Sequence, residues 1–139
     1  MGYAQTGTGK TACFLLPVLN KLCKDPYGIF ALILTPTREL GYQILEQVKL
    51  FSANFNVRVS LVTGGTDMVN QTTLLNDIPH IVIATPGRLA YFVDHDNCNL
   101  KSNLENLNFL ILDEADRMLS DEVMKPDLVT ILEAIPKER

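Results

Sequence analysis

The sequence lacks the features of secreted, disulfide-bonded or membrane-spanning proteins. Its 139 residues include three cysteines, at positions 13, 23 and 98, and no C-x-x-C pair. This spacing argues against a disulfide framework or a zinc site and is typical of a reducing compartment. The longest apolar run near the middle, at residues 29–34, is far shorter than the ~18 residues of a membrane span. The N-terminus has neither a basic flank nor a long apolar core, so we expect no signal peptide and no membrane association.

Internal repeats, low-complexity tracts and Pro/Gly/Ser-rich linkers are also missing, and the length is that of one domain. Hydrophobic residues make up 47% of the chain, enough for a core and too many for a disordered protein. We therefore expect a soluble intracellular protein, located in the nucleus, nucleolus or cytoplasm. Of the cysteines, we expect Cys13 and Cys23 to pack as small apolar groups on the first helix.

The sequence has no excess of positive charge. This absence would normally argue against a nucleic-acid partner. Twelve lysines and arginines are set against sixteen aspartates and glutamates, giving a net charge of −4. The distribution is uneven, because residues 1–60 carry six basic and three acidic side chains and residues 61–139 carry six and thirteen. The acidic total therefore excludes only wholesale polyanion binding, and a local cluster of phosphate donors is compatible with it.

Short apolar runs alternate with longer amphipathic segments. Continuous apolar runs are typical of strands buried on both faces of a parallel sheet. The predicted strands are residues 30–35, 59–62, 81–84 and 109–112, and the predicted helices are about residues 10–24, 37–53, 67–76, 87–95 and 122–134. This alternation predicts a three-layer α/β domain with a mainly parallel sheet, whose active site lies at the carboxyl ends of the strands.

A glycine-rich segment precedes the first predicted helix. It consists of Ala4, Gln5, Thr6, Gly7, Thr8, Gly9, Lys10 and Thr11. Glycines let backbone N–H groups turn around a phosphate chain at a helix N-terminus. In such a P-loop, Lys10 would reach the β- and γ-phosphates and the Thr11 hydroxyl would bind Mg²⁺. The alternative is a glycine-rich turn that caps an ordinary helix, but Gly-Lys-Thr opening an apolar helix favours phosphate binding.

An acidic segment, Asp113-Glu114-Ala115-Asp116, directly follows the fourth predicted strand. A carboxylate at the tip of a buried strand can hold a Mg²⁺ that bridges nucleotide phosphates. A neighbouring carboxylate can orient or deprotonate the attacking water. Taken alone, the segment could equally be a solvated acidic turn that caps the next helix, but the P-loop upstream favours the first interpretation.

Two further loops present donors suited to phosphate groups. Thr37 and Arg38 follow the predicted strand at residues 30–35, and Thr85 and Arg88 follow the predicted strand at residues 81–84. A hydroxyl, a helix N-terminus and an arginine can grip a sugar–phosphate backbone without reading bases. The glycine pair ending at Gly65 would allow close backbone approach at the same edge. Each loop alone is compatible with routine capping or turn chemistry.

Taken in order, the motifs AQTGTGKT, PTREL, the glycine pair, TPGRL and DEAD resemble the N-terminal half of a DEAD-box RNA helicase. The resemblance extends from Ala4 to Pro136 and accounts for Ala4, since the phosphate loop of that family begins with alanine. It implies that residues 1–139 form part of the N-terminal RecA-like, ATP-binding domain. It also implies ATP and Mg²⁺ as ligands, RNA as a partner bound through its backbone, and protein activators or a ribonucleoprotein as further partners.

The resemblance also implies individual roles. Lys10 and Thr11 would bind the ATP phosphates and Mg²⁺, Asp113 would coordinate Mg²⁺ through water, and Glu114 would activate the hydrolytic water. The implied RNA-backbone contacts are Thr37, Arg38, Gly65, Thr85 and Arg88. Asp116 would couple hydrolysis to strand separation through a Ser-Ala-Thr element. The family's adenine-reading glutamine, the strand before Ala4, the Ser-Ala-Thr strand and the second lobe are not in the sequence, so we expect an incomplete domain.

Two other functions are weighed against an RNA helicase lobe. One is a non-catalytic remnant that binds RNA or protein without ATP turnover, since the arginines of a second lobe contribute about 10³–10⁵ in rate. The other is a P-loop ATPase or kinase that acts on a small molecule. The PTREL and TPGRL loops argue against the latter, because such an enzyme needs no backbone-gripping loops.

Overall fold

The computed structural model describes residues 8–95 and 98–137, and for residues 8–10 only the backbone. The elements in chain order are α1 (Thr8–Lys24), β1 (Ala31–Leu34), α2 (Arg38–Phe51), β2 (Val59–Val62), α3 (Met68–Asn76), β3 (Ile81–Ala84), α4 (Pro86–His95), α5 (Leu100–Leu104), β4 (Phe109–Leu112), α6 (Ala115–Ser120) and α7 (Met124–Ala134). No helix in these two ranges is long and apolar enough to cross a membrane.

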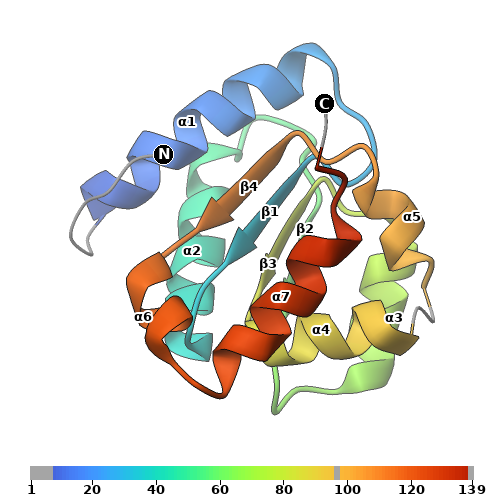
Figure 1. Cartoon of the computed structure of the whole chain (residues 1–139). Helices are drawn as coiled ribbons and strands as arrows, with labels where there is room; N and C mark the ends of the chain where they lie inside the picture. Colours follow the sequence, from blue (N-terminus) through green and yellow to red (C-terminus); the bar gives the residue numbers. More distant parts are fainter. Residues whose placement is uncertain (1–7, 96–97, 138–139) are drawn as a thin grey trace.

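The four strands form one parallel sheet in the order β2-β3-β1-β4 (Figure 1). Their last residues are paired across the sheet, with Leu34 opposite both Ala84 and Leu112, and Val62 opposite Ala84. All four strands therefore end at one level, and the loops that follow them start from a common edge. The predicted α/β class and the parallel sheet are confirmed.

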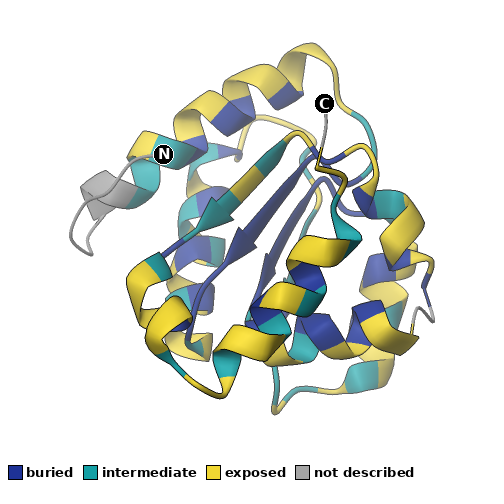
Figure 2. Ribbon diagram, in the orientation of Figure 1, coloured by how far each residue is buried: buried dark blue, intermediate teal, exposed yellow. Residues whose placement is uncertain are grey.

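Alternate strand residues face two helical layers. Ile33 belongs to a core cluster that includes Leu19 of α1 and Ile44 of α2. Its neighbours Leu32 and Leu34 belong to a second cluster, which includes residues of α3 to α7. Figure 2 shows the central strands buried between these layers. Because every residue of β1 and β3 is buried, both faces of these strands select apolar side chains, which explains their uninterrupted apolar sequence.

The strand β4 is less buried than its sequence predicts. Leu110 is 37% exposed, although it lies within the apolar run Phe109–Leu112. The strand pairs with β1 on one side, and no other strand of the described residues pairs with its second side. An apolar strand at a sheet edge keeps one row of backbone groups and part of its side chains accessible.

The structure also contains features that the sequence analysis missed or assigned wrongly. The helices α5 and α6 span only five and six residues, too few for a helical period to stand out. The expected packing of Cys13 and Cys23 is wrong, because both thiols are exposed. Leu16, which is 52% exposed, shares their outer face of α1, whereas Leu15 and Leu19 point inward.

A buried histidine joins the amino ends of β2 and β3. His80 is 6% exposed, and its Nδ1 accepts a hydrogen bond of 3.1 Å from the backbone N–H of Arg58. Burial, followed by the charge of Arg58, lowers the pKa of His80 below its usual value of 6.5. The imidazole is thus neutral in the folded state, as the accepting nitrogen requires.

This lowered pKa makes stability depend on pH. As pH falls through 6.5, the unfolded chain takes up the His80 proton before the folded chain does. The free energy of unfolding should therefore be highest above pH 6.5 and should decline as pH falls from 6.5 toward the lower pKa of the folded state. Urea denaturation at pH 7.5, 6.5 and 5.5 measures this decline. His80→Asn keeps an acceptor but cannot titrate, so a decline of equal size in that variant would contradict the assignment.

Candidate functional site

The loop after β1 begins helix α2 and carries a hydroxyl and an arginine. Thr37 has extended backbone and is the N-cap of α2, and its Oγ1 accepts a hydrogen bond of 3.2 Å from the N–H of Leu40. The Thr37 hydroxyl can still donate its proton to a ligand, since it acts as acceptor in the cap. Arg38 is the first residue of the helix and is exposed. A hydroxyl donor and a guanidinium thus lie side by side at the start of α2.

Arg38 contacts the glycine turn that follows β2. Its Nη1 donates a long hydrogen bond of 3.5 Å to the carbonyl of Gly64. Gly65 has φ +80°, a conformation that favours glycine, and a Cβ at this position would overlap the Arg38 guanidinium. The turn therefore favours glycine at position 65 because of its backbone conformation, and a side chain there would displace the Arg38 guanidinium.

The first turn of α4, directly after β3, brings a second arginine to the same turn. Nη1 of Arg88 lies 3.3 Å from the carbonyl of Thr66 and 3.0 Å from Oε1 of Gln71, and donates to both. Thr85, which is half-buried, ties the loop before α4 to β2 through a 3.1 Å hydrogen bond from its N–H to the carbonyl of Val62. The structure thus brings the predicted residues Arg38 and Arg88 together on either side of one turn.

The acidic segment after β4 lies at the other end of this edge. Asp113 is 7% exposed, and its N–H donates to the carbonyl of Leu34 at the end of β1, at 2.8 Å. Glu114 adopts the left-handed conformation with φ +56° and is the N-cap residue of α6. Its carbonyl accepts from the N–H groups of Arg117 and Met118, and its carboxylate lies 3.4 Å from Nη1 of Arg117. Asp116 is exposed.

Left-handed backbone at a residue other than glycine costs of order 1–3 kcal/mol and recurs at functional sites. For Glu114 this conformation turns the chain sharply between the strand and α6. The buried Asp113 and the half-buried Glu114 consequently occupy the tip of β4, as the sequence predicted.

Half of the predicted phosphate loop lies outside the described residues. Ala4, Gln5, Thr6 and Gly7 lie outside them, whereas Thr8, Gly9 and Lys10 form the first turn of α1 and Thr11 is half-buried. The ammonium of Lys21 stands 5.7 Å from the ring centre of Phe109, the first residue of β4. The later part of α1 therefore lies at the amino end of β4, and Figure 1 shows α1 beginning on the side to which the strands point.

Comparison with known proteins shows to which family the chain belongs. The profile of the DEAD/DEAH box helicase family matches residues 1–139. The chain belongs to the DEAD/DEAH box helicase family. The Mus musculus protein named probable ATP-dependent RNA helicase DDX49 is 50% identical over an alignment of 141 residues, which covers 100% of this chain and 29% of that protein. This chain therefore spans less than a third of the length of that relative.

Two further relatives are similar over the same region. DEAD-box ATP-dependent RNA helicase 36 of Arabidopsis thaliana is 48% identical over 139 residues, covering 100% of this chain and 28% of the relative. ATP-dependent RNA helicase dbp8 of Schizosaccharomyces pombe is 52% identical over 120 residues, covering 86% of this chain and 26% of the relative.

The residues at the tip of β4 and in α1 fit a nucleotide-borne Mg²⁺. Mg²⁺ prefers oxygen ligands and is commonly held by one or two carboxylates together with phosphates and water. The buried carboxylate of Asp113 and the hydroxyl of Thr11 are oxygen donors of that kind. Within residues 8–95 and 98–137 no group of three or more His, Cys, Asp or Glu side chains is placed to hold a metal by itself. Asp113 and Thr11 thus suit a cation that arrives with phosphates.

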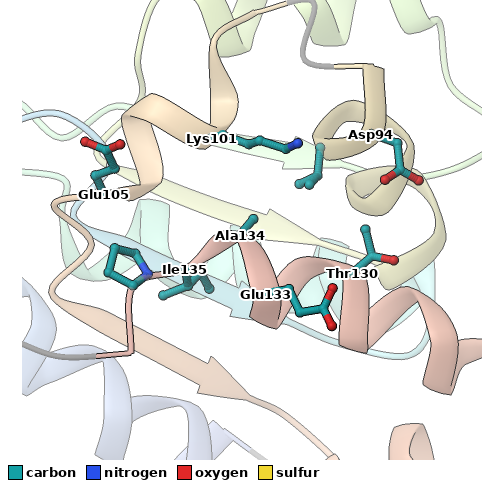
Figure 3. Close-up of a pocket in the computed structure, with 9 residues that line it drawn as sticks. Asp94, Lys101, Glu105, Thr130, Glu133, Ala134 and Ile135 are labelled. Carbon is teal, nitrogen blue, oxygen red and sulfur yellow. The ribbon is translucent and has the colours of Figure 1, made fainter.

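A hollow of about 430 Å³ elsewhere on the surface is separate from these loops. It lies between α4, α5 and the end of α7, and its lining includes Asp94, Lys101 and Glu133 (Figure 3). Crossover helices run antiparallel to their strands, so the ends of α4 and α7 lie at the amino edge of the sheet. The hollow is therefore on the side of the domain opposite the candidate site.

Sequence reasoning missed one polar residue of the site. Gln71, on α3, is 3% exposed and bonds both to the glycine turn and to Arg88. No motif marks it, because a single glutamine on a short helix predicts an exposed position. The signal is visible only in three dimensions, where Gln71 lies on the same helix face as the buried Leu75.

The glycine turn offers a matched pair of substitutions. Gly65→Ala should lower the free energy of unfolding by about 1–2 kcal/mol, because alanine is strained at positive φ and its Cβ displaces Arg38. Gly64→Ala should change it by less than about 0.5 kcal/mol, since a Cβ there meets no described atom within 4 Å. Urea denaturation of both variants measures the difference. Equal effects of the two substitutions would show that the turn does not require glycine at position 65.

Proposed function

We propose that this chain is the ATP-binding and RNA-backbone-binding part of an ATP-dependent RNA helicase. The observation that carries the proposal is the meeting of Arg38 and Arg88 on the turn Gly64–Thr66. Two guanidiniums on one glycine turn, beside the N-terminus of α2, provide donors for consecutive backbone phosphates. The names of the relatives, all ATP-dependent RNA helicases, support RNA and ATP as the ligands.

The RNA contacts we propose are Thr37, Arg38, Gly65, Thr85 and Arg88. The arginines would neutralise phosphates, the threonine hydroxyls would donate to phosphate oxygens, and Gly65 would let the RNA backbone approach the turn. We propose that these groups contact phosphates rather than base edges. Binding should consequently be independent of base sequence.

The ATP-binding residues we propose are Ala4, Gln5, Thr6, Gly7, Thr8, Gly9, Lys10 and Thr11. The N-terminus of α1 and the Lys10 ammonium would attract the phosphates, and Thr11 and Asp113 would hold Mg²⁺, which supplies charge stabilisation to the phosphates. The Glu114 carboxylate would accept a proton from the water that attacks the γ-phosphate. Asp116 would link this step to movement of the RNA. We further propose an intracellular protein that works with protein activators or a ribonucleoprotein.

Hydrolysis is testable in a chimaera in which this segment replaces the matching 29% of the mouse relative. Glu114→Gln preserves the shape of the side chain but removes the base, so RNA-stimulated ATPase activity should fall at least about 10²-fold. ATP binding, measured by calorimetry with Mg²⁺, should persist in Glu114→Gln and disappear in Lys10→Ala. Glu122→Gln, an exposed glutamate before α7, is the matched control. An unchanged ATPase rate in Glu114→Gln would show that Glu114 is not the base.

RNA binding is testable on the 139-residue chain with two single-stranded RNAs of unrelated sequence. Each phosphate contact contributes about −0.7 to the slope of log affinity against log salt, so Arg88→Ala should weaken both complexes equally and flatten the slope by about that amount. Arg58→Ala is the control of equal charge, because Arg58 bonds to the carbonyl of Ile78 near the amino edge. A loss confined to one RNA sequence would indicate base reading instead.

A further inference from the structure

Gln71 is a polar residue at a core position. Its side chain is 3% exposed, on the face of α3 that also buries Leu75. Burying an amide without hydrogen-bond partners costs on the order of 1–3 kcal/mol. An apolar residue would fill this position without that cost. The glutamine must therefore be explained by the partners of its amide group.

The two ends of the amide have different partners. Nε2 donates to the carbonyl of Thr63, at 2.8 Å, and to Oγ1 of Thr66, whereas Oε1 accepts from Nη1 of Arg88, at 3.0 Å. A reversed amide would set N–H groups against the guanidinium and an oxygen against the Thr63 carbonyl. The orientation is thus fixed by its neighbours. The position needs a donor and an acceptor. Glutamine has both, whereas glutamate has only an acceptor and methionine has no amide donor or acceptor.

These bonds link Arg88 of α4 to the glycine turn after β2. Thr63 and Thr66 bracket the glycine turn after β2, and the hydroxyl of Thr66 also donates to the Thr63 carbonyl, at 2.9 Å. Both hydrogen bonds of Arg88 leave from Nη1. Within the described residues its Nη2 and Nε have no hydrogen-bond partner, so one edge of the guanidinium is held and the other is available. Such an arrangement suits bidentate binding of a phosphate.

We infer that Gln71 is a positioning residue that fixes the Arg88 guanidinium against the glycine turn so that its second edge faces an RNA phosphate. The inference rests on the proposed function for the phosphate, but the Gln71–Arg88 link itself does not. Gln71 contacts the arginine through Oε1 and is too buried to contact RNA. It acts through Arg88, and its substitution should matter only while Arg88 is present.

Two variants separate positioning from simple packing. Gln71→Met has similar length but no amide group, so it removes the bonds of Gln71 to the turn and to Arg88 and leaves Arg88 only its longer bond of 3.3 Å to the Thr66 carbonyl. Gln71→Glu keeps an acceptor for Arg88 but loses the donor to Thr63. Urea denaturation should show that both variants are less stable than the parent chain. Only Gln71→Met should loosen the Arg88 guanidinium. In Gln71→Glu, the guanidinium should keep its position although the chain is less stable.

The first readout is the pair of Nη–Hη NMR signals of Arg88 in the 139-residue chain without RNA, because Nη1 donates both of its hydrogen bonds; they are assigned by their loss in Arg88→Lys. The Nη1 and Nη2 signals should merge toward the averaged position of a solvated, rotating guanidinium in Gln71→Met and stay separate, as in the parent chain, in Gln71→Glu. Unchanged signals in folded Gln71→Met would overturn the inference. This readout decides the Gln71–Arg88 link even if the chain binds no RNA.

The second readout is affinity for single-stranded RNA. Gln71→Met should weaken binding about tenfold, the value of one hydrogen bond to a charged group, and Gln71→Glu should weaken it much less. In the Arg88→Ala background, Gln71→Met should have no further effect. An equal loss in both backgrounds would mean that Gln71 acts by general packing. If Arg88→Ala itself binds RNA normally, the proposed RNA contact fails, while the NMR signals still decide the positioning role.

Discussion

The common register of the four parallel strands is the constraint on which the site depends. Because Leu34, Ala84, Leu112 and Val62 are paired at one level, the loops that follow them emerge side by side. A slip of one residue would move a loop by about 3.3 Å and turn the strand's side chains to the opposite face. The apolar side chains on both faces of β1 and β3 oppose any such slip. The packing of the apolar core therefore determines how far apart the polar groups of the loops lie, although those groups are outside the core.

Residues with positive φ differ in whether a side chain is needed at their position. Gly65 reaches φ +80° with little strain because no side chain is needed there. Glu114 adopts φ +56° although it carries a side chain, and the N–H groups of Arg117 and Met118 hold its carbonyl. Ile78 and Asn99 also have positive φ, away from the strand tips, so this conformation alone does not mark a site. At Glu114 it coincides with the buried Asp113 and with a motif predicted from sequence, and this coincidence supports a function.

The sequence predicted the strands, the loops and most candidate residues because these depend on local patterns. Apolar runs defined all four strands to within one or two residues, and short motifs marked Arg38, Arg88 and Asp113. Features that depend on distant neighbours were missed. Gln71 is buried because Arg88 and Thr63 bond to it, and Leu110 is exposed because no second strand of the described residues pairs with β4. Neither fact is contained in the residues that flank these positions.

The strand order also separates the arginines of the proposed RNA site from the carboxylates. The glycine turn follows β2, whereas Asp113 and Glu114 follow β4 at the opposite end of the sheet. Arg38 starts next to β4 in sheet order, yet it reaches back to Gly64, so both guanidiniums lie toward β2. Three strand spacings of about 4.8 Å separate β2 from β4, roughly 14 Å, which exceeds the Debye length of about 8 Å at physiological salt. Repulsion between the exposed part of the acidic segment and an anion at the glycine turn is therefore screened, whereas burial limits the screening of Asp113. The order β2-β3-β1-β4 thus places the guanidiniums of the proposed RNA site and the carboxylates of the proposed Mg²⁺ site at different ends of one sheet edge.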